Sequence, residues 1–105
     1  MIKGDRMKIK TDSLLQEIYD NVYDLELCQT RYEFSENIAG RSKRWMSTII
    51  SQKTGPSAIS LIVIRNNIMS SARATKRNKT ISTAKQICSR IDKVVCERIM
   101  SDESV

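Results

Sequence analysis

Histidine is absent from this 105-residue sequence, which removes the commonest general base and the commonest zinc ligand. One proline and three glycines are too few for the many turns of an all-β chain. The three cysteines form no Cys-X-X-Cys pair, so we expect neither a disulfide framework nor a zinc site, and a reducing compartment is indicated. The longest apolar run, residues 61–64, is far shorter than the roughly 20 residues of a membrane-spanning helix.

Catalytic motifs and targeting signals are also missing. Without histidine, a serine or cysteine nucleophile would need a lysine or carboxylate base, and neither a nucleophile-elbow motif nor a phosphate-binding P-loop is present. The basic N-terminus is followed by no apolar segment of the kind that secretory signals contain. We therefore predict a protein that is not an enzyme, binds no metal or cofactor, and lies in the cytoplasm.

Positive charge is concentrated in one part of the chain. The formal net charge is +6, yet residues 37–91 contain eleven lysines and arginines and no acid, whereas residues 11–36 contain seven acids and a single base, Arg31. A surface of one sign is typical of a protein that binds a polyanion, most often nucleic acid. The alternative is a solvated basic face, or a face that pairs with the acidic segment of the same chain.

Apolar residues recur at spacings of three and four along most of the chain, which predicts an all-α fold. We expect a compact bundle of about five helices that contains a helix-turn-helix and ends in a long C-terminal helix. The predicted organisation is a flexible basic segment (1–11), a helix-turn-helix domain (12–72), a basic connector (73–80), a C-terminal helix (81–100) and a flexible tail (101–105). Within the domain we expect helices at 13–26, 31–38, from Ser42 to about residue 52, and at 57–71.

Several details of this organisation stay open in the sequence. The segment 70–80 is either a loop or a continuation of the fourth helix. That helix is apolar nearly all round in its first half, which favours a position at the buried centre of the domain. Cys88 and Cys96 fall near one face of the last helix, where small buried apolar residues are expected.

The second and third predicted helices have the outline of a helix-turn-helix. Thr30 and Glu33 form a capping-box pattern at the start of the second helix. Gly40 suits the turn because it tolerates a positive φ. A third helix capped by Ser42 would expose long polar side chains near its N-terminus, where such side chains reach base edges in the major groove.

This arrangement gives each polar side chain a predicted contact. Lys43 and Arg44 can donate to guanine, and Ser47 and Thr48 can reach base edges or phosphates. Arg31, at the start of the second helix, suits a phosphate. The complete predicted DNA-binding set is Arg31, Arg41, Ser42, Lys43, Arg44, Trp45, Ser47, Thr48, Gln52, Lys53, Arg73, Lys76 and Arg77. For Trp45 the alternative is a half-buried packing residue, and for the cluster 73–79 it is a solvated linker.

The run Thr30-Arg31-Tyr32-Glu33-Phe34-Ser35, followed by Gly40, residues 41–49, Gly55-Pro56-Ser57 and an apolar helix, resembles the phage-repressor (Cro-like) helix-turn-helix. It is still more similar to short uncharacterised bacterial proteins of that type. The resemblance covers about residues 14–70. It implies DNA binding in the cytoplasm of a bacterial or phage system, at the nucleoid.

Position by position, the resemblance implies that Arg31 contacts phosphate. It also implies a reading face made of Lys43, Arg44, Trp45, Ser47 and Thr48. The sequence departs from the pattern at three points. Ser35 and Arg41 stand where an alanine and an apolar residue are usual, and the stretch 34–40 is one residue longer than usual.

The sequence therefore predicts a sequence-specific double-stranded DNA-binding protein that regulates transcription. Two half-sites normally require two copies, so we expect a homodimer. Its contact would be the C-terminal helix, through the wide apolar stripe of Ile81, Ile87, Ile91, Val94, Val95 and Ile99. The alternative function is a small protein-interaction module, a phage or mobile-element inhibitor or adaptor, that binds an acidic protein.

Overall fold

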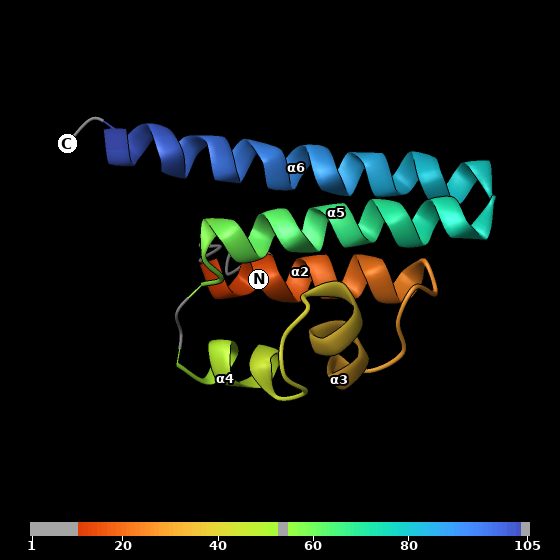
Figure 1. Cartoon of the computed structure of the whole chain (residues 1–105), viewed down its shortest axis with the longest axis horizontal. Coiled ribbons are helices and arrows are strands. Elements are labelled where there is room, and N and C mark those ends of the chain that lie inside the picture. Colours follow the sequence, from red (N-terminus) through yellow and green to blue (C-terminus); the bar gives the residue numbers. More distant parts are fainter. Residues whose placement is uncertain (1–10, 53–54, 104–105) are drawn as a thin grey trace, which may run out of the picture.

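The computed structural model describes residues 11–52 and 55–103 (Figure 1). Over these residues the structure contains no strand, so the predicted all-α class with a long C-terminal helix is confirmed. In chain order the helical segments are α2 (Thr11–Asp24), α3 (Arg31–Glu33) continued by the π-helical η1 (Phe34–Ile38), α4 (Trp45–Ser51), α5 (Ala58–Thr75) and α6 (Asn78–Glu103). The expected tail at 101–105 is helical as far as Glu103. Residues 104–105, and nearly all of the segment expected at 1–11, lie outside the described residues.

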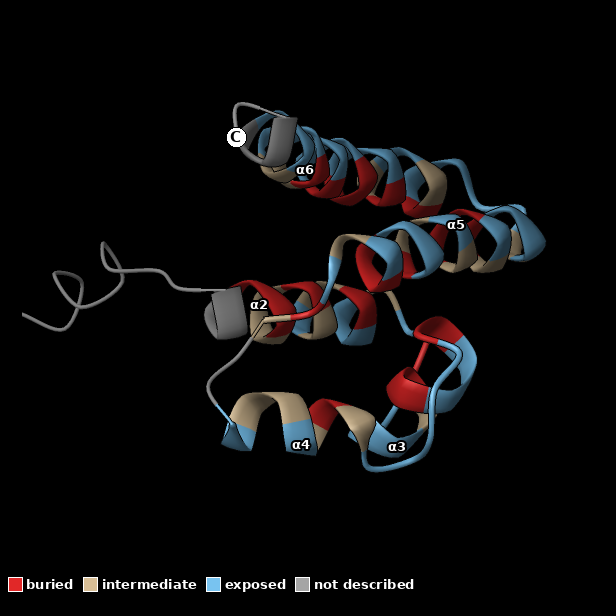
Figure 2. Cartoon of the chain, turned by 60° about the vertical axis from the view of Figure 1, so that its left-hand side comes forward, coloured by how far each residue is buried: buried red, intermediate tan, exposed pale blue. Residues whose placement is uncertain are grey.

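The helices are stacked on either side of α2. Helices α5 and α6 run antiparallel as a hairpin, with α6 outermost, and α2 lies beneath them (Figure 1). The short segments α3–η1 and α4 lie on the side of α2 away from α6. The buried residues of α6, α5 and α2 face the interior between these helices (Figure 2).

The core is made by the apolar stripes that the sequence pattern identified. On α2 the buried residues are Leu14, Leu15, Ile18 and Val22, which recur at helical spacing. One cluster joins them to Phe34 and to the apolar side chains of the other helices. The remaining large fully buried side chains of this cluster are Ile38, Met46, Leu61, Ile64, Ile68 and Ile91.

Helix α5 is longer and more exposed than the sequence predicted. It begins after Ser57, whose side chain accepts a hydrogen bond from the backbone N–H of Ser60 at 3.1 Å, and it ends at Thr75. Of the two interpretations of segment 70–80, the structure shows the continuation of the helix, and only Lys76 and Arg77 of the expected basic connector at 73–80 separate α5 from α6. The expectation that the first half of α5 is buried on all sides is wrong, since Ile59 is 71% exposed.

The apolar stripe of α6 packs within the molecule. Ile87, Ile91 and Val95 are buried, and Ile81 and Val94 are partly buried against the same core. The apolar stripe that was expected to form the contact between two copies thus packs largely inside a single copy. Of the six residues, only Ile99 is exposed. Among the described helices, none combines the length and the apolar character needed to cross a bilayer.

Candidate nucleic-acid interface

The helical segment 31–38 begins at a side-chain cap. The Thr30 hydroxyl oxygen accepts a hydrogen bond from the backbone N–H of Glu33 at 3.0 Å, as the capping-box pattern predicts. The Glu33 carboxylate reaches back by one residue more than predicted and accepts from the backbone N–H of Gln29 at 2.9 Å. Two donors at the start of the helix are satisfied in this way.

A buried hydrogen bond fixes α4 against this segment. Ser35 is fully buried, and its hydroxyl oxygen accepts from the backbone N–H of Met46 at 3.1 Å. This N–H lies in the first turn of α4, where no partner within the helix is available. Gly40 has a φ of +67° and turns the chain between the two helices, as predicted from its tolerance of positive φ.

The connection between the two helices differs from the prediction. It spans residues 39–44, between the end of η1 at Ile38 and the start of α4 at Trp45, whereas the turn of a helix-turn-helix has about 3–4 residues. Ser42 was expected to cap the third helix. Instead its carbonyl oxygen accepts from the N–H of Trp45 at 3.0 Å, and Arg44 is the N-cap residue, without a side-chain cap. Lys43 and Arg44 therefore lie in the turn before α4 and not within it.

Helix α4 lies on the surface with one side against the core. Met46 is its buried residue, and Trp45 is half-buried and packs against the core with Ile49 and Ile50. This position favours the packing role of Trp45 over a contact with DNA. The outer side presents the exposed residues Thr48, Ser51 and Gln52, with Ser47 half-buried.

The cations next to α4 face solvent. Lys43 and Arg44 are exposed, and neither forms an ion pair within the described residues. We call these two residues the α4 cations. Lys53, at the other end of α4, lies outside the described residues.

Two arginines of the predicted DNA-binding set are held by other side chains of the protein. The Arg31 guanidinium donates from Nη2 to the side-chain oxygen of Gln16 on α2 at 2.9 Å. The Arg41 guanidinium donates to the Ser60 hydroxyl on α5 at 3.1 Å. Both residues are exposed, yet each guanidinium is engaged by another side chain of the protein, so these two arginines are weaker candidates than the α4 cations.

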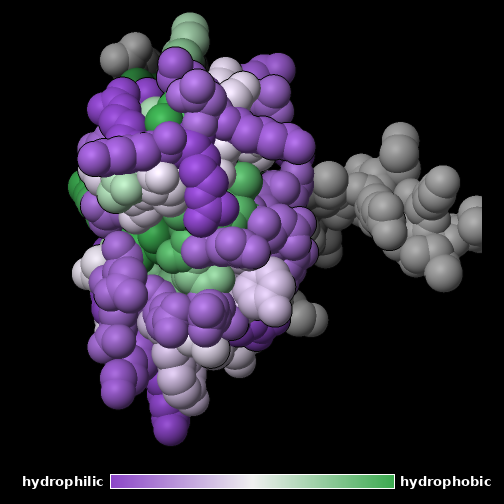
Figure 3. Space-filling view, turned by 90° about the vertical axis from the view of Figure 1, so that its right-hand side faces the viewer, coloured by the Kyte–Doolittle hydropathy of each residue, from purple (hydrophilic) through white to green (hydrophobic). Residues whose placement is uncertain are grey.

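The remaining predicted residues lie elsewhere. Arg73, Lys76 and Arg77 are at the turn that joins α5 to α6, on the far side of the molecule from α4 (Figure 1). We call them the hairpin cations. Hydrophilic side chains cover most of this end of the molecule and surround a smaller hydrophobic area (Figure 3). The predicted site is therefore divided into two separate groups.

A family profile matches residues 15–104, which include α3–η1, α4 and the whole α5–α6 hairpin. The chain belongs to DUF6626, a family of unknown function. Comparisons of this DUF6626 chain with curated proteins and with solved structures gave no match.

The acidic segment 11–36 neutralises only part of the basic region of the DUF6626 chain. Glu17 pairs with Arg90 on α6, and Glu26 lies 3.8 Å from the Arg77 guanidinium. A third pair joins Arg65 of α5 to Asp92 of α6. Most of the described cations between residues 37 and 91 are thus left without an ion pair among the described residues.

Two cations that the sequence analysis missed lie together on the hairpin of the DUF6626 chain. Arg65 and Lys85 line a surface groove between α5 and α6, which Arg73 also lines. The available signal was the eight-residue spacing between Arg65 and Arg73, which places both on one side of a helix. The reading of that segment as a buried helix followed by a connector obscured this signal.

The cysteines of the DUF6626 chain make no cluster of metal ligands within the described residues. Cys88 is buried, as expected, whereas Cys96 is exposed, which corrects the expectation for that residue. Burial raises the pKa of the Cys88 thiol. Burial and the nearby Glu33 carboxylate raise the pKa of Cys28 to about 11. Cys28 and Cys88 are therefore protonated at neutral pH.

Proposed function

We propose that this DUF6626 protein binds double-stranded DNA, with α4 and the turn before it against the duplex. The observation that carries the proposal is the placement of α4. It lies on the outside of the fold, fixed by the buried Ser35–Met46 hydrogen bond. The α4 cations are exposed beside it.

The contacts follow from what these side chains can reach. Lys43 and Arg44 can neutralise phosphates, which supplies most of the affinity of a DNA-binding protein. Thr48 and Gln52 on the outer side of α4 offer a hydroxyl and an amide for base edges. Helix α4 has seven residues and is about 10 Å long, so one copy covers few base pairs. We extend the proposal to a cytoplasmic transcriptional regulator in which two copies occupy two half-sites.

The first experiment measures affinity for duplex DNA against salt. A pool of fluorescent duplexes of about 30 base pairs with random centres spans two half-sites. We expect binding that weakens with salt, with a log–log slope of about 0.9 per neutralised phosphate. Lys43→Glu and Arg44→Glu should each weaken binding at least about tenfold and reduce that slope, because each removes a phosphate contact.

The matched control is Lys93→Glu, which changes the net charge by the same amount. Lys93 is an exposed residue of α6, and helix α6 lies on the opposite side of the molecule from α4 (Figure 1). Its replacement should alter affinity by no more than about twofold. Equal losses in Lys93→Glu and Arg44→Glu would mean that net charge, and not the α4 surface, determines binding.

Sequence preference is tested separately by selection of bound duplexes from the random pool. Thr48→Ala and Gln52→Ala should change which sequences are enriched, because base-edge contacts carry specificity. Wild-type protein that enriches no sequence would reject the regulator role. Wild-type protein that binds no duplex even at low salt would reject DNA binding altogether.

The exposed apolar residues of the hairpin favour a second candidate function. In this alternative the protein is an interaction module that binds an acidic protein. Ile59 and Ile62 near the start of α5 are 71% and 42% exposed, and Ile99 and Met100 near the end of α6 are 46% and 63% exposed. Arg98 donates to the carbonyl oxygen of Pro56, so these two helix ends are adjacent. Failure of duplex binding at low salt would leave this candidate as the leading one.

A further inference from the structure

The α5–α6 hairpin carries an open groove of about 570 Å³ on its outer side. Its floor is formed by Met69 and Cys88, which are 7% and 2% exposed. Its walls carry cationic and polar side chains: Arg65, Asn66, Ser70 and Arg73 from α5, and Lys85 and Ser89 from α6. This volume lies in the range of about 300–1,000 Å³ that is typical of small-molecule sites.

Helical spacing brings the wall residues to one side of each helix. Arg65, Met69 and Arg73 follow one another at intervals of four, and residues four apart lie on the same side of a helix. On α6, Lys85 and Ser89 are also four residues apart. The cations therefore converge from two helices on one region.

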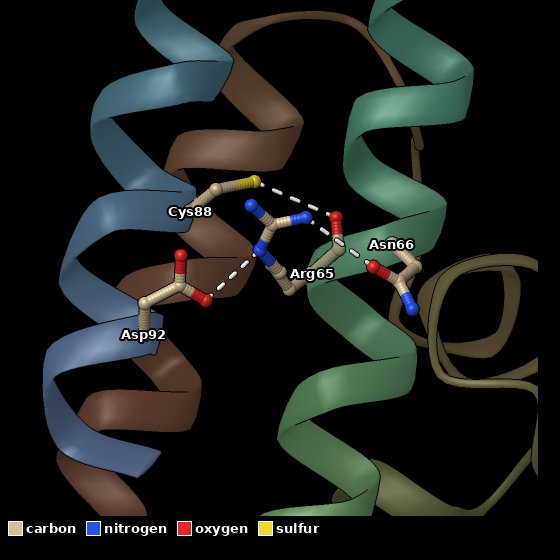
Figure 4. A network of polar contacts seen from close by, with 4 residues as sticks. All are labelled: Arg65, Asn66, Cys88 and Asp92. Atoms are coloured by element: carbon tan, nitrogen blue, oxygen red, sulfur yellow. Dashed lines mark hydrogen bonds and ion pairs between the residues drawn. The ribbon is translucent and has the colours of Figure 1, made fainter. Parts of the chain in front are cut away.

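Arg65 is held in position by its neighbours. Its Nε donates to the Asp92 carboxylate at 2.9 Å, and its Nη1 donates to the Asn66 side-chain oxygen at 3.3 Å. Figure 4 shows the guanidinium between α5 and α6, with Asp92 on one side and Asn66 on the other. Within the described residues, Nη2 has no hydrogen-bond partner, so a positioned donor is available to a ligand.

The groove carries excess positive charge. Asp92 is its only acid, and its carboxylate is engaged by Arg65. Arg73 and Lys85 have no ion pair among the described residues. Two positive charges are thus uncompensated, and the hydroxyls of Ser70 and Ser89 add neutral donors beside them.

We propose that this groove binds a phosphate monoester group. Such a group carries about −1.5 to −2 charges at neutral pH and three acceptor oxygens, which matches two uncompensated cations and the donors of Arg65 and the serines. A guanidinium fork suits the geometry of phosphate oxygens. The site is separate from α4, and this inference does not rest on the proposed function.

The test is a titration followed by the backbone amide resonances of the full chain. The probes are glucose 6-phosphate and inorganic phosphate, with glucose and sulfate as controls, at about 0.15 M salt. We expect saturable shifts at residues 65–73 and 85–92 with both phosphates, and none with glucose. Equal affinity for the two phosphates assigns recognition to the phosphate group itself, and tighter binding of the ester shows that the groove also contacts the organic part.

Substitutions of the groove cations test whether these side chains bind the phosphate group. Arg73→Gln and Lys85→Gln should each weaken glucose 6-phosphate binding at least about tenfold, because each removes a charge-assisted contact. Lys93→Gln, which removes an exposed cation outside the groove, should leave binding unchanged. All three side chains are exposed, and far-UV circular dichroism confirms that each variant is folded.

Four results would overturn the proposal. The first is the absence of saturation by either phosphate at about 10 mM, which corresponds to negligible affinity. The second is sulfate binding as tight as phosphate binding, which would indicate a general anion surface. The third is an equal loss in the Lys93→Gln control. The fourth is that duplex DNA shifts the groove amides while the monoester does not, which would assign the groove to phosphodiesters.

Discussion

Ser35 shows how one side chain can serve both packing and hydrogen bonding. The residue is fully buried at a position where the repressor-like pattern has alanine. A buried hydroxyl without a partner would cost roughly 1–3 kcal/mol, but this hydroxyl accepts from the N–H of Met46. The departure from the pattern is therefore compatible with close packing of α4. Arg41, the other unusual residue type, extends its guanidinium to Ser60.

Cys28 makes the folded state less stable at alkaline pH. Its pKa rises from 9.0 to about 11 on folding, because the thiol is buried and lies near the Glu33 carboxylate. The folded state holds the proton more tightly, so the stabilisation is fully present below about pH 9 and is lost as the pH rises toward about 11. We expect the free energy of unfolding to fall by about 2 kcal/mol over this window.

Urea denaturation at several pH values measures this decline. Cys28→Ala should make it shallower, and not abolish it, because the pKa values of Cys88 and Tyr19 are also raised by burial. Cys96→Ala is the matched control, since this cysteine is exposed, and it should leave the decline unchanged. A decline of the same size in Cys28→Ala would contradict the assignment.

At the scale of the elements, two helices end in an unusual way. The chain leaves α2 at Glu26, with a φ of +64°, and leaves α5 at Lys76, with a φ of +59°. The left-handed conformation costs a non-glycine residue roughly 1–2 kcal/mol, which is why glycine is usual there. We expect Glu26→Gly and Lys76→Gly each to raise the free energy of unfolding by about 1 kcal/mol, measured by urea denaturation.

Gly40 provides the matched control in the opposite direction. Its φ is +67°, and an added Cβ would lie at an ordinary 3.7 Å from Cγ1 of Val63. Gly40→Ala should therefore destabilise the protein by about 1 kcal/mol, through the backbone alone. A loss of stability in Glu26→Gly would mean that the ion pair of Glu26 with Arg77 outweighs the backbone strain.

The sequence predicted the helices well but several of their ends poorly. The helices themselves were found because buried residues such as Leu15, Ile18 and Val22 repeat at helical spacing. The end of α2 and the end of α5 were misplaced, because no glycine marks them. The start of α4 was misplaced because Ser42 forms a backbone turn to Trp45, a choice that the serine side chain does not reveal.

At the scale of the whole molecule, the α6 stripe decides whether the chain folds. Ile91 is fully buried, whereas Ile99, two helical turns further on, is 46% exposed. Ile91→Asp should bury an unpaired charge and remove about 4 kcal/mol or more of stability, most of what a small domain has. Ile99→Asp should change the melting temperature by only a few degrees.

Far-UV circular dichroism during heating, with size-exclusion chromatography, distinguishes the outcomes. We expect Ile91→Asp to lose its helical signal and Ile99→Asp to retain it. A folded Ile91→Asp protein that merely changes its oligomeric state would contradict the packing of α6 and would restore this stripe as the contact between two copies.

The candidate site was the part least accessible from the sequence. Charge composition identified the basic region, and the helix-turn-helix outline predicted that the third helix exposes polar side chains. Neither could reveal that Lys43 and Lys76 lie on different sides of the molecule, because that separation depends on how the hairpin stacks over α2. The ion pair between Arg65 and Asp92 joins residues far apart in the chain, so no local sequence pattern predicts it.

The π-helical turn of η1 gives the chain a place where its length can change at little cost. The N–H of Ala39 donates to the carbonyl oxygen of Phe34, five residues back, where an α-turn would span four. This turn therefore holds one residue more than an α-helical turn, as π-bulges do. Deletion of either Glu36 or Asn37, both exposed, should therefore let this turn close as ordinary α-helix.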